Sequence, residues 1–266
     1  MSMTGPQVVP SATTVLQTQG AAPRRGMPVL LRRLMPLIVV AVVLLVTYVW
    51  VSSLELDSIE QRTLNADYIA ARIGEHLVLS IIASVLVAVL AIPAGIAVSR
   101  SRSQAFRGIV IGIANIGQAT PAIGVVILLA IVWQTGFTTA LLALVIYSFL
   151  PVLQNTIAGL AQVDPSVRES ARGMGMTSTQ VLRRVELPLA SPVILAGLRT
   201  ALVFAVGVAT VATFINAGGL GDMIINGLKL QRYPVLVVGA ILVAAIAVLI
   251  DWAAGVVEDI VRPKGL

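Results

Sequence analysis

No charged residue occurs between Gly108 and Val163, a stretch of fifty-six residues. A helix crosses the hydrocarbon core of a bilayer with about 20 apolar residues, so this stretch is long enough for two crossings. The whole chain has a mean hydropathy of +0.97, and only 11% of its 266 residues are charged, whereas soluble domains carry about 25%. A soluble core of this size would leave much of that apolar surface in water. The sequence therefore predicts an all-α, polytopic membrane protein.

About six transmembrane helices are expected, because six segments have sufficient length and hydropathy. The third and fourth come from the uncharged stretch, and the polar residues around Gly136 supply a turn between them. The predicted spans cover about 34–54, 76–99, 108–133, 138–160, 192–216 and 234–256.

The amino-terminal residues 1–30 are rich in Pro, Gly, Ser and Thr and lack periodicity, which predicts a disordered cytoplasmic tail ahead of a transmembrane domain at 31–266. A secretory signal peptide is the rival interpretation. However, the apolar run 34–54 is longer than the apolar region of a typical signal peptide, and no A-x-A-like cleavage site follows it. We therefore expect the first span to remain in the protein.

The distribution of Lys and Arg predicts the orientation, because loops on the cytoplasmic side carry an excess of these residues. With six spans and both termini in the cytoplasm, 14 of the 18 basic residues lie inside. The other four, which would lie outside, are Arg62, Arg72, Lys229 and Arg232. A single span over 108–160 would spoil this asymmetry. Both termini are therefore expected in the cytoplasm.

Several functional classes are disfavoured by what the sequence lacks. There is no cysteine, and neither Lys229 nor Lys264 follows a glycine, so the chain has no P-loop for ATP. The interiors of the first five predicted spans hold no ionisable group of the kind that ion-driven carriers use. Asp251 lies near the cytoplasmic end of the last span, where we expect it to be hydrated. His76 lies at the start of the second span, where a structural role is expected. We therefore expect no enzymatic activity, no metal site and no nucleic-acid binding.

Uncharged polar residues inside the predicted spans are candidates for a translocation pathway. Such groups either form hydrogen bonds between helices or line a hydrated path, and both interpretations stay open at this point. The candidate pathway residues are Asn115, Gln118, Thr120, Gln154, Asn155, Thr213 and Asn216.

A short basic segment, ESARGMGMTSTQVLRRVELP, follows the uncharged stretch and carries signals for two helices. Asp164-Pro165 supplies an N-cap and a proline at the first helical position, and Ser166–Glu169 offers an overlapping capping box. Gly173 and Gly175 then interrupt the first helix.

A second capping box, Thr177–Gln180, begins another helix, which Pro188 is expected to stop at Leu187. Ser191-Pro192 would then cap the next span. Two short helices at an angle would protrude on the cytoplasmic side. They would form either a rigid docking element for a partner's groove or an amphipathic helix on anionic lipid.

This segment resembles the EAA loop of importer-type ABC permeases. The pattern is a Glu, two small residues, a Gly six positions after the Glu, and an aliphatic-x-Leu-Pro close. Ser170 replaces the usual alanine and Val185 the usual isoleucine. The resemblance implies that residues 164–190 couple the chain to an ATPase through Glu169, Ser170, Ala171, Gly173, Gly175, Met176, Val185, Leu187 and Pro188.

The resemblance extends from about Leu77 to Leu228. The runs YSFLPVLQNTIAGLAQVDPSVRESARGMGMT, ELPLASPVILAGLRTA and ATFINAGGLGDMIINGL are similar to the osmoprotectant (glycine betaine, carnitine and choline) permeases. The stretch GGLGD alone also resembles methionine importer permeases. This family implies a type I ABC importer permease fold with a cytoplasmic coupling helix.

The resemblance also implies partners and a location. We expect a second permease, identical or paralogous, a cytoplasmic ATPase dimer that holds ATP and Mg, and an extracytoplasmic solute-binding protein, in a bacterial cytoplasmic membrane. No cofactor is expected in this chain. The expected function is import of glycine betaine, carnitine, choline or proline-betaine. The alternatives are a permease for methionine-type amino acids or other small zwitterions such as ergothioneine, and an ATP-independent channel or facilitator.

Overall fold

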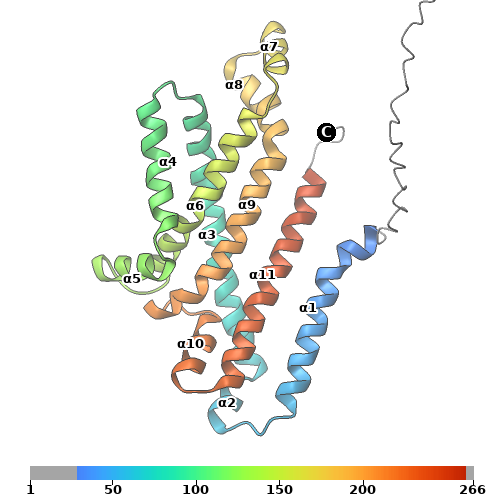
Figure 1. Ribbon diagram of the computed structural model, residues 1–266, viewed down its shortest axis with the longest axis vertical. Helices are drawn as coiled ribbons and strands as arrows, with labels where there is room; N and C mark the ends of the chain where they lie inside the picture. Colours follow the sequence, from blue (N-terminus) through green and yellow to red (C-terminus); the bar gives the residue numbers. More distant parts are fainter. Residues whose placement is uncertain (1–28, 262–266) are drawn as a thin grey trace, which may run out of the picture. The chain divides into compact units, whose positions relative to one another are not determined.

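The computed structural model describes residues 29–261, and within that range every regular element is a helix (Figure 1). The chain divides into a short unit that ends at Met35 and a second unit that begins at Pro36. Helix α1 (Val29–Ser52) contains the boundary between them. The predicted tail falls almost wholly outside the described residues. Four of the basic residues used for the topology also fall outside, namely Arg24, Arg25, Arg262 and Lys264.

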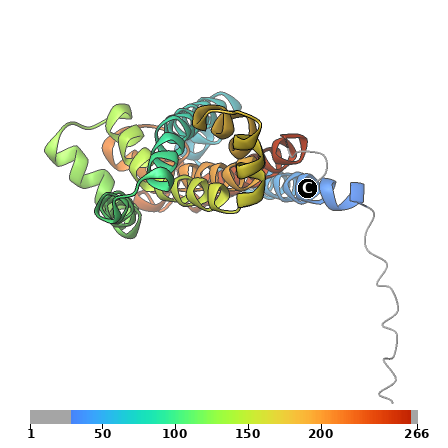
Figure 2. The same ribbon diagram turned by 90° about the horizontal axis from the view of Figure 1, so that it is seen from above.

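Within residues 29–261, five helices are long and apolar enough to cross a membrane. They are α1, α3 (Ala66–Arg100), α6 (Phe137–Ala161), the continuous helix 178–215, which includes α9 (Leu187–Ala209), and α11 (Tyr233–Val261). Helices α3, α6, α9 and α11 pack on one another in the second unit, and Figure 2 shows them gathered along their axes.

Small residues bring the central helices close together. The buried core of α3, α6 and α9 includes Ala83, Ala143 and Ala201. A Cβ on Gly95 would lie 2.6 Å from the Cβ of Thr156, and a Cβ on Gly197 would lie 2.6 Å from the Cβ of Asn155. Close approach through Gly and Ala is how helices associate in lipid, where burial of apolar surface gives little gain.

The expected span 108–133 is not one straight helix. It divides into α4 (Gln104–Ala119) and α5 (Ala122–Val132), which meet at an angle of 101°. Thr120 has φ −71° and ψ 134°, the extended conformation that a following proline favours, so Pro121 ends the first helix. With 11 residues, α5 is about 16 Å long and too short to cross the core alone. The pair makes a sixth span only if both helices are counted together.

The second span begins ten residues earlier than its apolar run suggests. The side chain of Asn65 accepts a hydrogen bond of 2.8 Å from the backbone N–H of Tyr68 and so caps α3. His76 therefore lies inside the helix rather than at its start, and it is fully buried. Its Nε2 lies 3.0 Å from the carbonyl oxygen of Val206 on α9. The expectation of a structural role for this histidine agrees with that contact.

The turn between α5 and α6 lies where the polar residues predicted it, with Gly136 directly before Phe137. The backbone N–H of Gly136 donates to the carbonyl oxygen of Ile215, 2.6 Å away, in the 3-10 helix η2 (Thr210–Ile215). This bond ties the beginning of α6 to the end of the long helix 178–215.

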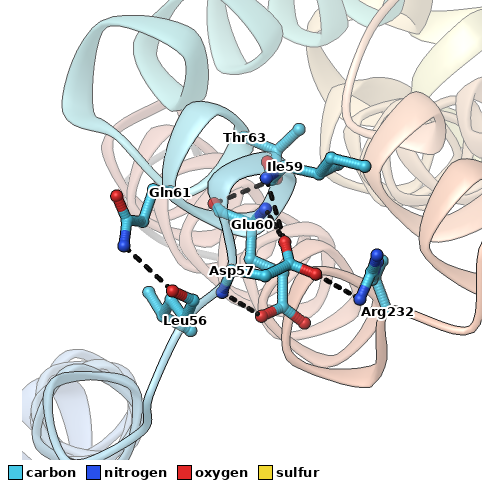
Figure 3. A network of polar contacts seen from close by, with 7 residues as sticks. All are labelled: Leu56, Asp57, Ile59, Glu60, Gln61, Thr63 and Arg232. Atoms are coloured by element: carbon cyan, nitrogen blue, oxygen red, sulfur yellow. Dashed lines mark hydrogen bonds and ion pairs between the residues drawn. The ribbon is translucent and has the colours of Figure 1, made fainter.

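The connection from α1 to α3 contains the short helix α2 (Ser58–Thr63), which begins with a capping box (Figure 3). Oδ1 of Asp57 accepts from the backbone N–H groups of Ile59 and Glu60, and the Glu60 carboxylate accepts from the N–H of Asp57. The hydrogen bond that the Asp57 carboxylate accepts from the backbone N–H of Glu60 is the main reason why the pKa of Asp57 lies below its usual value. Asp57 also forms an ion pair with Arg232, directly before α11.

Pro188 does not stop a helix, contrary to the sequence prediction. The chain stays helical from α8 (Ser178–Val181) through the π-helical turn η1 (Leu182–Glu186) into α9. A proline ring clashes with the preceding turn of a regular α-helix, and the wider π turn gives the ring room. Ser191 likewise caps nothing, because its hydroxyl donates to the carbonyl oxygen of Pro188 within the helix.

Candidate functional site

The segment 164–190 begins with α7 (Pro165–Gly173), which lies beyond the end of α6 (Figure 1). Asp164 is the N-cap, and its carboxylate accepts a hydrogen bond of 2.7 Å from the backbone N–H of Ser166. This bond lowers the pKa of Asp164. The alternative capping box over Ser166–Glu169 is not used, because Pro165 already occupies the first helical position.

Helix α7 ends in a Schellman motif centred on Gly175. Its N–H donates to the carbonyl oxygen of Arg172 at 2.9 Å, and the N–H of Met176 donates to that of Ala171 at 3.2 Å. Gly175 has φ +83°, a conformation that L side chains rarely adopt, whereas Gly173 is still helical. A Cβ at either position would meet nothing within 4 Å. Gly175 is therefore required for its backbone conformation and not for lack of space.

The second predicted capping box is present and begins the long helix 178–215. The backbone N–H of Gln180 donates to the Thr177 hydroxyl at 3.3 Å, and the N–H of Thr177 donates to the Gln180 side chain at 2.8 Å. On both sides of the glycine turn, backbone groups that a helix end would leave unpaired are therefore hydrogen-bonded within the segment. The turn is held by hydrogen bonds between residues that are close in the sequence.

The segment presents side chains to its surroundings and buries few of them. Ala171 and Val181 are buried and anchor the two helices, whereas Met174 is 72% exposed and Val167 is 40% exposed. Of the predicted coupling residues, Ala171 is buried and Met176, Val185 and Leu187 are half-buried. The exposed members of the set are Glu169, Ser170, Gly173, Gly175 and Pro188.

The predicted pathway residues lie on three different elements. Asn115, Gln118 and Thr120 are on α4 and its end, and Gln154 and Asn155 are on α6. The Asn115, Thr120 and Asn155 side chains each donate to a carbonyl oxygen four residues earlier in their own helix. These bonds satisfy polar groups within one helix and leave the proposed pathway untested.

The other two pathway candidates, Thr213 and Asn216, lie at the end of the long helix. Thr213 donates its hydroxyl proton to a carboxylate oxygen of Asp222, which begins a polar cluster that the sequence did not indicate. Nη1 of Arg72 lies 2.9 Å from Asp222 and 2.8 Å from Glu75, and Glu75 accepts from the N–H of Gly219 at 2.8 Å. Burial raises the pKa of Asp222, and the charge of Arg72 opposes that shift.

The glycines of GGLGD give this cluster its close packing. A Cβ on Gly221 would lie 2.1 Å from the carbonyl oxygen of Thr210, and a Cβ on Gly219, which has φ +89°, would lie 3.1 Å from Nδ1 of His76. We refer to Gly218–Asp222 with its contacts on α3 as the glycine corner. The repeated glycines were the only sequence signal for it, since its partners are about 150 residues away.

Arg199 and Arg100 form further ion pairs between membrane helices. Arg199 on α9 donates two hydrogen bonds to Asp251 on α11, a contact that the sequence did not indicate, and it lies 3.8 Å from Glu258 of the same helix. Arg100, at the end of α3, pairs with Glu186 in the π turn, whose side chain is only 8% exposed. This pair connects the end of α3 to the segment 164–190.

Comparison with protein families gives a match over residues 91–263 to the model described as "Binding-protein-dependent transport system inner membrane component". The chain belongs to this family. The match includes α6, the segment 164–190 and Gly218–Asp222, whereas the residues of α3 that contact Gly218–Asp222 precede it.

The chain is similar to several transport permeases over most of their length. It is 41% identical to the glycine betaine/carnitine/choline transport system permease protein OpuCB of Bacillus subtilis, over 76% of this chain and 92% of that protein. It is 42% identical to the carnitine transport permease protein OpuCD of Listeria monocytogenes, over 75% and 89%. It is 36% identical to the osmoprotectant import permease protein OsmY of Salmonella typhimurium, over 83% and 92%.

Solved structures share the fold at low identity. A chain of the MetNI methionine ABC transporter aligns with a TM-score of 0.65 and 20% identity, over 73% of this chain and 96% of that one. A chain of an amino acid ABC transporter aligns with a TM-score of 0.63 and 19% identity, over 77% and 99%. The fold is that of ABC importer permeases, as the resemblance implied.

Proposed function

We propose that this chain is the permease subunit of an ATP-driven importer of osmoprotectants such as glycine betaine, carnitine and choline. A separate cytoplasmic ATPase dimer would bind ATP and Mg, and an extracytoplasmic binding protein would deliver the solute. The names of the similar permeases support this class of solute. Two permease chains, identical or paralogous, would enclose the path, with Asn115, Gln118, Thr120, Gln154, Asn155, Thr213 and Asn216 as its candidate lining.

The observation that carries the proposal is the construction of the segment 164–190. Side chains of the segment cap the beginning of each of its two helices, and the turn between them depends on one left-handed glycine. Its surface carries the exposed Met174. Such a segment fits a groove on a partner without first having to be ordered.

The second half of the segment is also the beginning of the long helix 178–215. A displacement of the docked end is therefore transmitted along one rigid element into the membrane, without a flexible joint that would absorb it. The ion pair between Arg100 and Glu186 gives a second connection, to α3. This is the arrangement that nucleotide-driven movement of an ATPase requires.

The test compares Gly175→Val with Gly173→Val in the complete transporter. Both side chains point into open space, but only residue 175 needs φ near +83°. We expect Gly175→Val to abolish uptake of labelled glycine betaine and to detach the ATPase, while the chain still inserts. Gly173→Val should retain most uptake. Wild-type uptake by Gly175→Val would refute the docking role.

A second experiment separates the proposal from an ATP-independent facilitator. Vesicles that contain this chain alone should show no flux of glycine betaine, and flux should require the ATPase, ATP and the binding protein. Excess methionine should leave uptake by the complete assembly unchanged. Flux through the chain alone would support the facilitator, and competition by methionine would support an amino-acid importer.

A further inference from the structure

An arginine-lined hollow of about 690 Å³ lies beside the segment 164–190. It is formed where the ends of α3, α6 and α7 meet the loop that leads into α4. Five arginines line it, together with a single acidic residue, Glu186. These arginines are Arg100, Arg102, Arg107, Arg168 and Arg172.

The charges in this hollow are unbalanced. Glu186 is already paired with Arg100, and Arg168 donates one hydrogen bond of 2.9 Å to the carbonyl oxygen of Val163. A guanidinium has five N–H donors, so most of the donors around the hollow remain available to a ligand. Arginines held around one hollow repel one another until an anion binds among them. The planar guanidinium forms paired hydrogen bonds with phosphate, and the phosphate oxygens can accept from several arginines at once.

A second hollow is lined by residues of the same three membrane helices, α3, α4 and α6. It has a volume of about 340 Å³ and lies between α3, α4 and α6, with only apolar side chains around it. Val110 and Ala114 of its lining share one face of α4 with Arg107, at spacings of three and seven residues. On α6, Ile146 and Phe149 share a face with Ile157 and Leu160 of the arginine-lined hollow.

The two hollows therefore follow the same faces of two helices. At 1.5 Å per residue, Ala114 lies about 10 Å along α4 from Arg107. The outer face of α4 beside them is apolar as well, with Ile109, Ile113 and Ile116 between 60% and 69% exposed. A ligand with an anionic phosphate at one end and an alkyl chain at the other matches this arrangement.

We propose that the two hollows form a binding site for one anionic phospholipid. The phosphate of the headgroup binds among the arginines, and one acyl chain occupies the apolar hollow. Because Arg168 and Arg172 come from α7 and Arg100 from α3, the headgroup joins the segment 164–190 to the bundle. The site is separate from the residues proposed to contact the ATPase.

The test measures lipid retention by native mass spectrometry on the full-length chain, purified with the subunits that accompany it. Phosphatidylglycerol and phosphatidylcholine are supplied in equal amounts. We expect the wild type to retain one phosphatidylglycerol per chain in preference to phosphatidylcholine. The double variant Arg102→Gln/Arg107→Gln should bind phosphatidylglycerol on the order of twenty- to thirty-fold more weakly, at about fivefold for each basic residue near a membrane surface.

The matched control is Arg183→Gln/Arg184→Gln, which removes the same charge from exposed arginines outside both hollows. It should leave retention within about twofold of wild type. Val110→Phe keeps every charge and fills the apolar hollow, so it should also displace the lipid. Thermal unfolding of each variant establishes that the chain is folded.

Four results would overturn the proposal. Equal retention of the two lipids by the wild type would remove the charge selectivity, and equal losses in the two double variants would show a general effect of charge. Displacement of the lipid by excess inorganic phosphate or glycerol phosphate would identify a site for soluble anions. Retention that is unchanged in folded Val110→Phe would exclude an acyl chain from the apolar hollow.

Discussion

Two turns that contain left-handed glycines lie at opposite ends of the second unit, and they are built in different ways (Figure 1). The turn at Gly175 is surrounded by open space and is held by hydrogen bonds within residues 171–180. The glycine corner is packed against α3, where Arg72, Glu75 and His76 contact it. One turn is held by residues close to it in the sequence, and the other depends on a distant part of the chain.

This difference indicates what each region is for. The glycine corner completes the fold, because its glycines leave room for the carbonyl oxygen of Thr210 and for the polar side chains of α3. The turn at Gly175 is exposed, and its conformation is held by hydrogen bonds between neighbouring residues. A segment of that kind is suited to contact with another protein. Substitutions in the glycine corner should therefore reduce the stability of the fold, whereas substitutions that distort the turn at Gly175 should impair contact with the partner.

The largest effect is expected from Gly221→Ala. The new Cβ would lie 2.1 Å from a backbone oxygen, and backbone cannot move aside as the end of a side chain can. We expect a loss of about 3 kcal/mol in the free energy of unfolding, measured by thermal unfolding in detergent. The matched control is Gly207→Ala in α9, where a Cβ meets nothing within 4 Å and stability should change little. Equal stability of the two variants would contradict the close packing of the corner.

The second largest effect on stability is expected from Asp222→Asn, which removes the charge that pairs with Arg72. The Nε atom of Arg72 is already buried without a hydrogen-bond partner, so this arginine depends on its carboxylate contacts. We expect a loss of about 2 kcal/mol in unfolding free energy. Glu75→Gln should cost less, because Glu75 is more exposed and the amide retains an oxygen for the N–H of Gly219. The reverse order would contradict the assigned roles in the cluster.

The smallest effect on stability is expected from Gly175→Asn, and its comparison with Gly219→Asn distinguishes the two turns most sharply. Asparagine adopts the left-handed conformation more readily than other non-glycine residues. Gly175→Asn has open space around it and should retain most uptake, with a loss of about 1 kcal/mol or less. Gly219→Asn needs a similar conformation but would press on His76, so it should destabilise the fold. If both variants behaved alike, the distinction between the two turns would fail.

Local features of the fold were predictable from the sequence, and the contacts between distant residues were not. Asp164, Thr177 and Gly175 are cap and turn residues whose roles depend on a few neighbours, and the structure contains each of them as predicted. The long apolar segments likewise indicated the membrane helices. Pro121 is a local signal for the break between α4 and α5. The hydropathy does not change around it, and for this reason the sequence predicts one span there.

Other errors have a common physical cause. Pro188 is a helix breaker by its local chemistry, but a π turn accommodates it once the helix is held by packing at both ends. The early start of α3 was missed because Arg72 and Glu75 are charged, and their partners in the glycine corner are far away in the sequence. The ion pair of Asp251 was not predicted for the same reason, since nothing near it in the sequence indicates Arg199 on another helix.

Site-directed crosslinking tests the central claim most directly, and the absence of cysteine from the chain makes single-cysteine variants unambiguous. Met174→Cys places a photoreactive label on the 72% exposed side chain beside Gly175, and Leu230→Cys places one on a 57% exposed side chain near the glycine corner. In the purified transporter, the label at residue 174 should crosslink to the ATPase subunit, and the label at residue 230 should not. Labelling only of lipid or detergent from residue 174, with the ATPase present in the same complex, would contradict the proposal that this segment is the docking element.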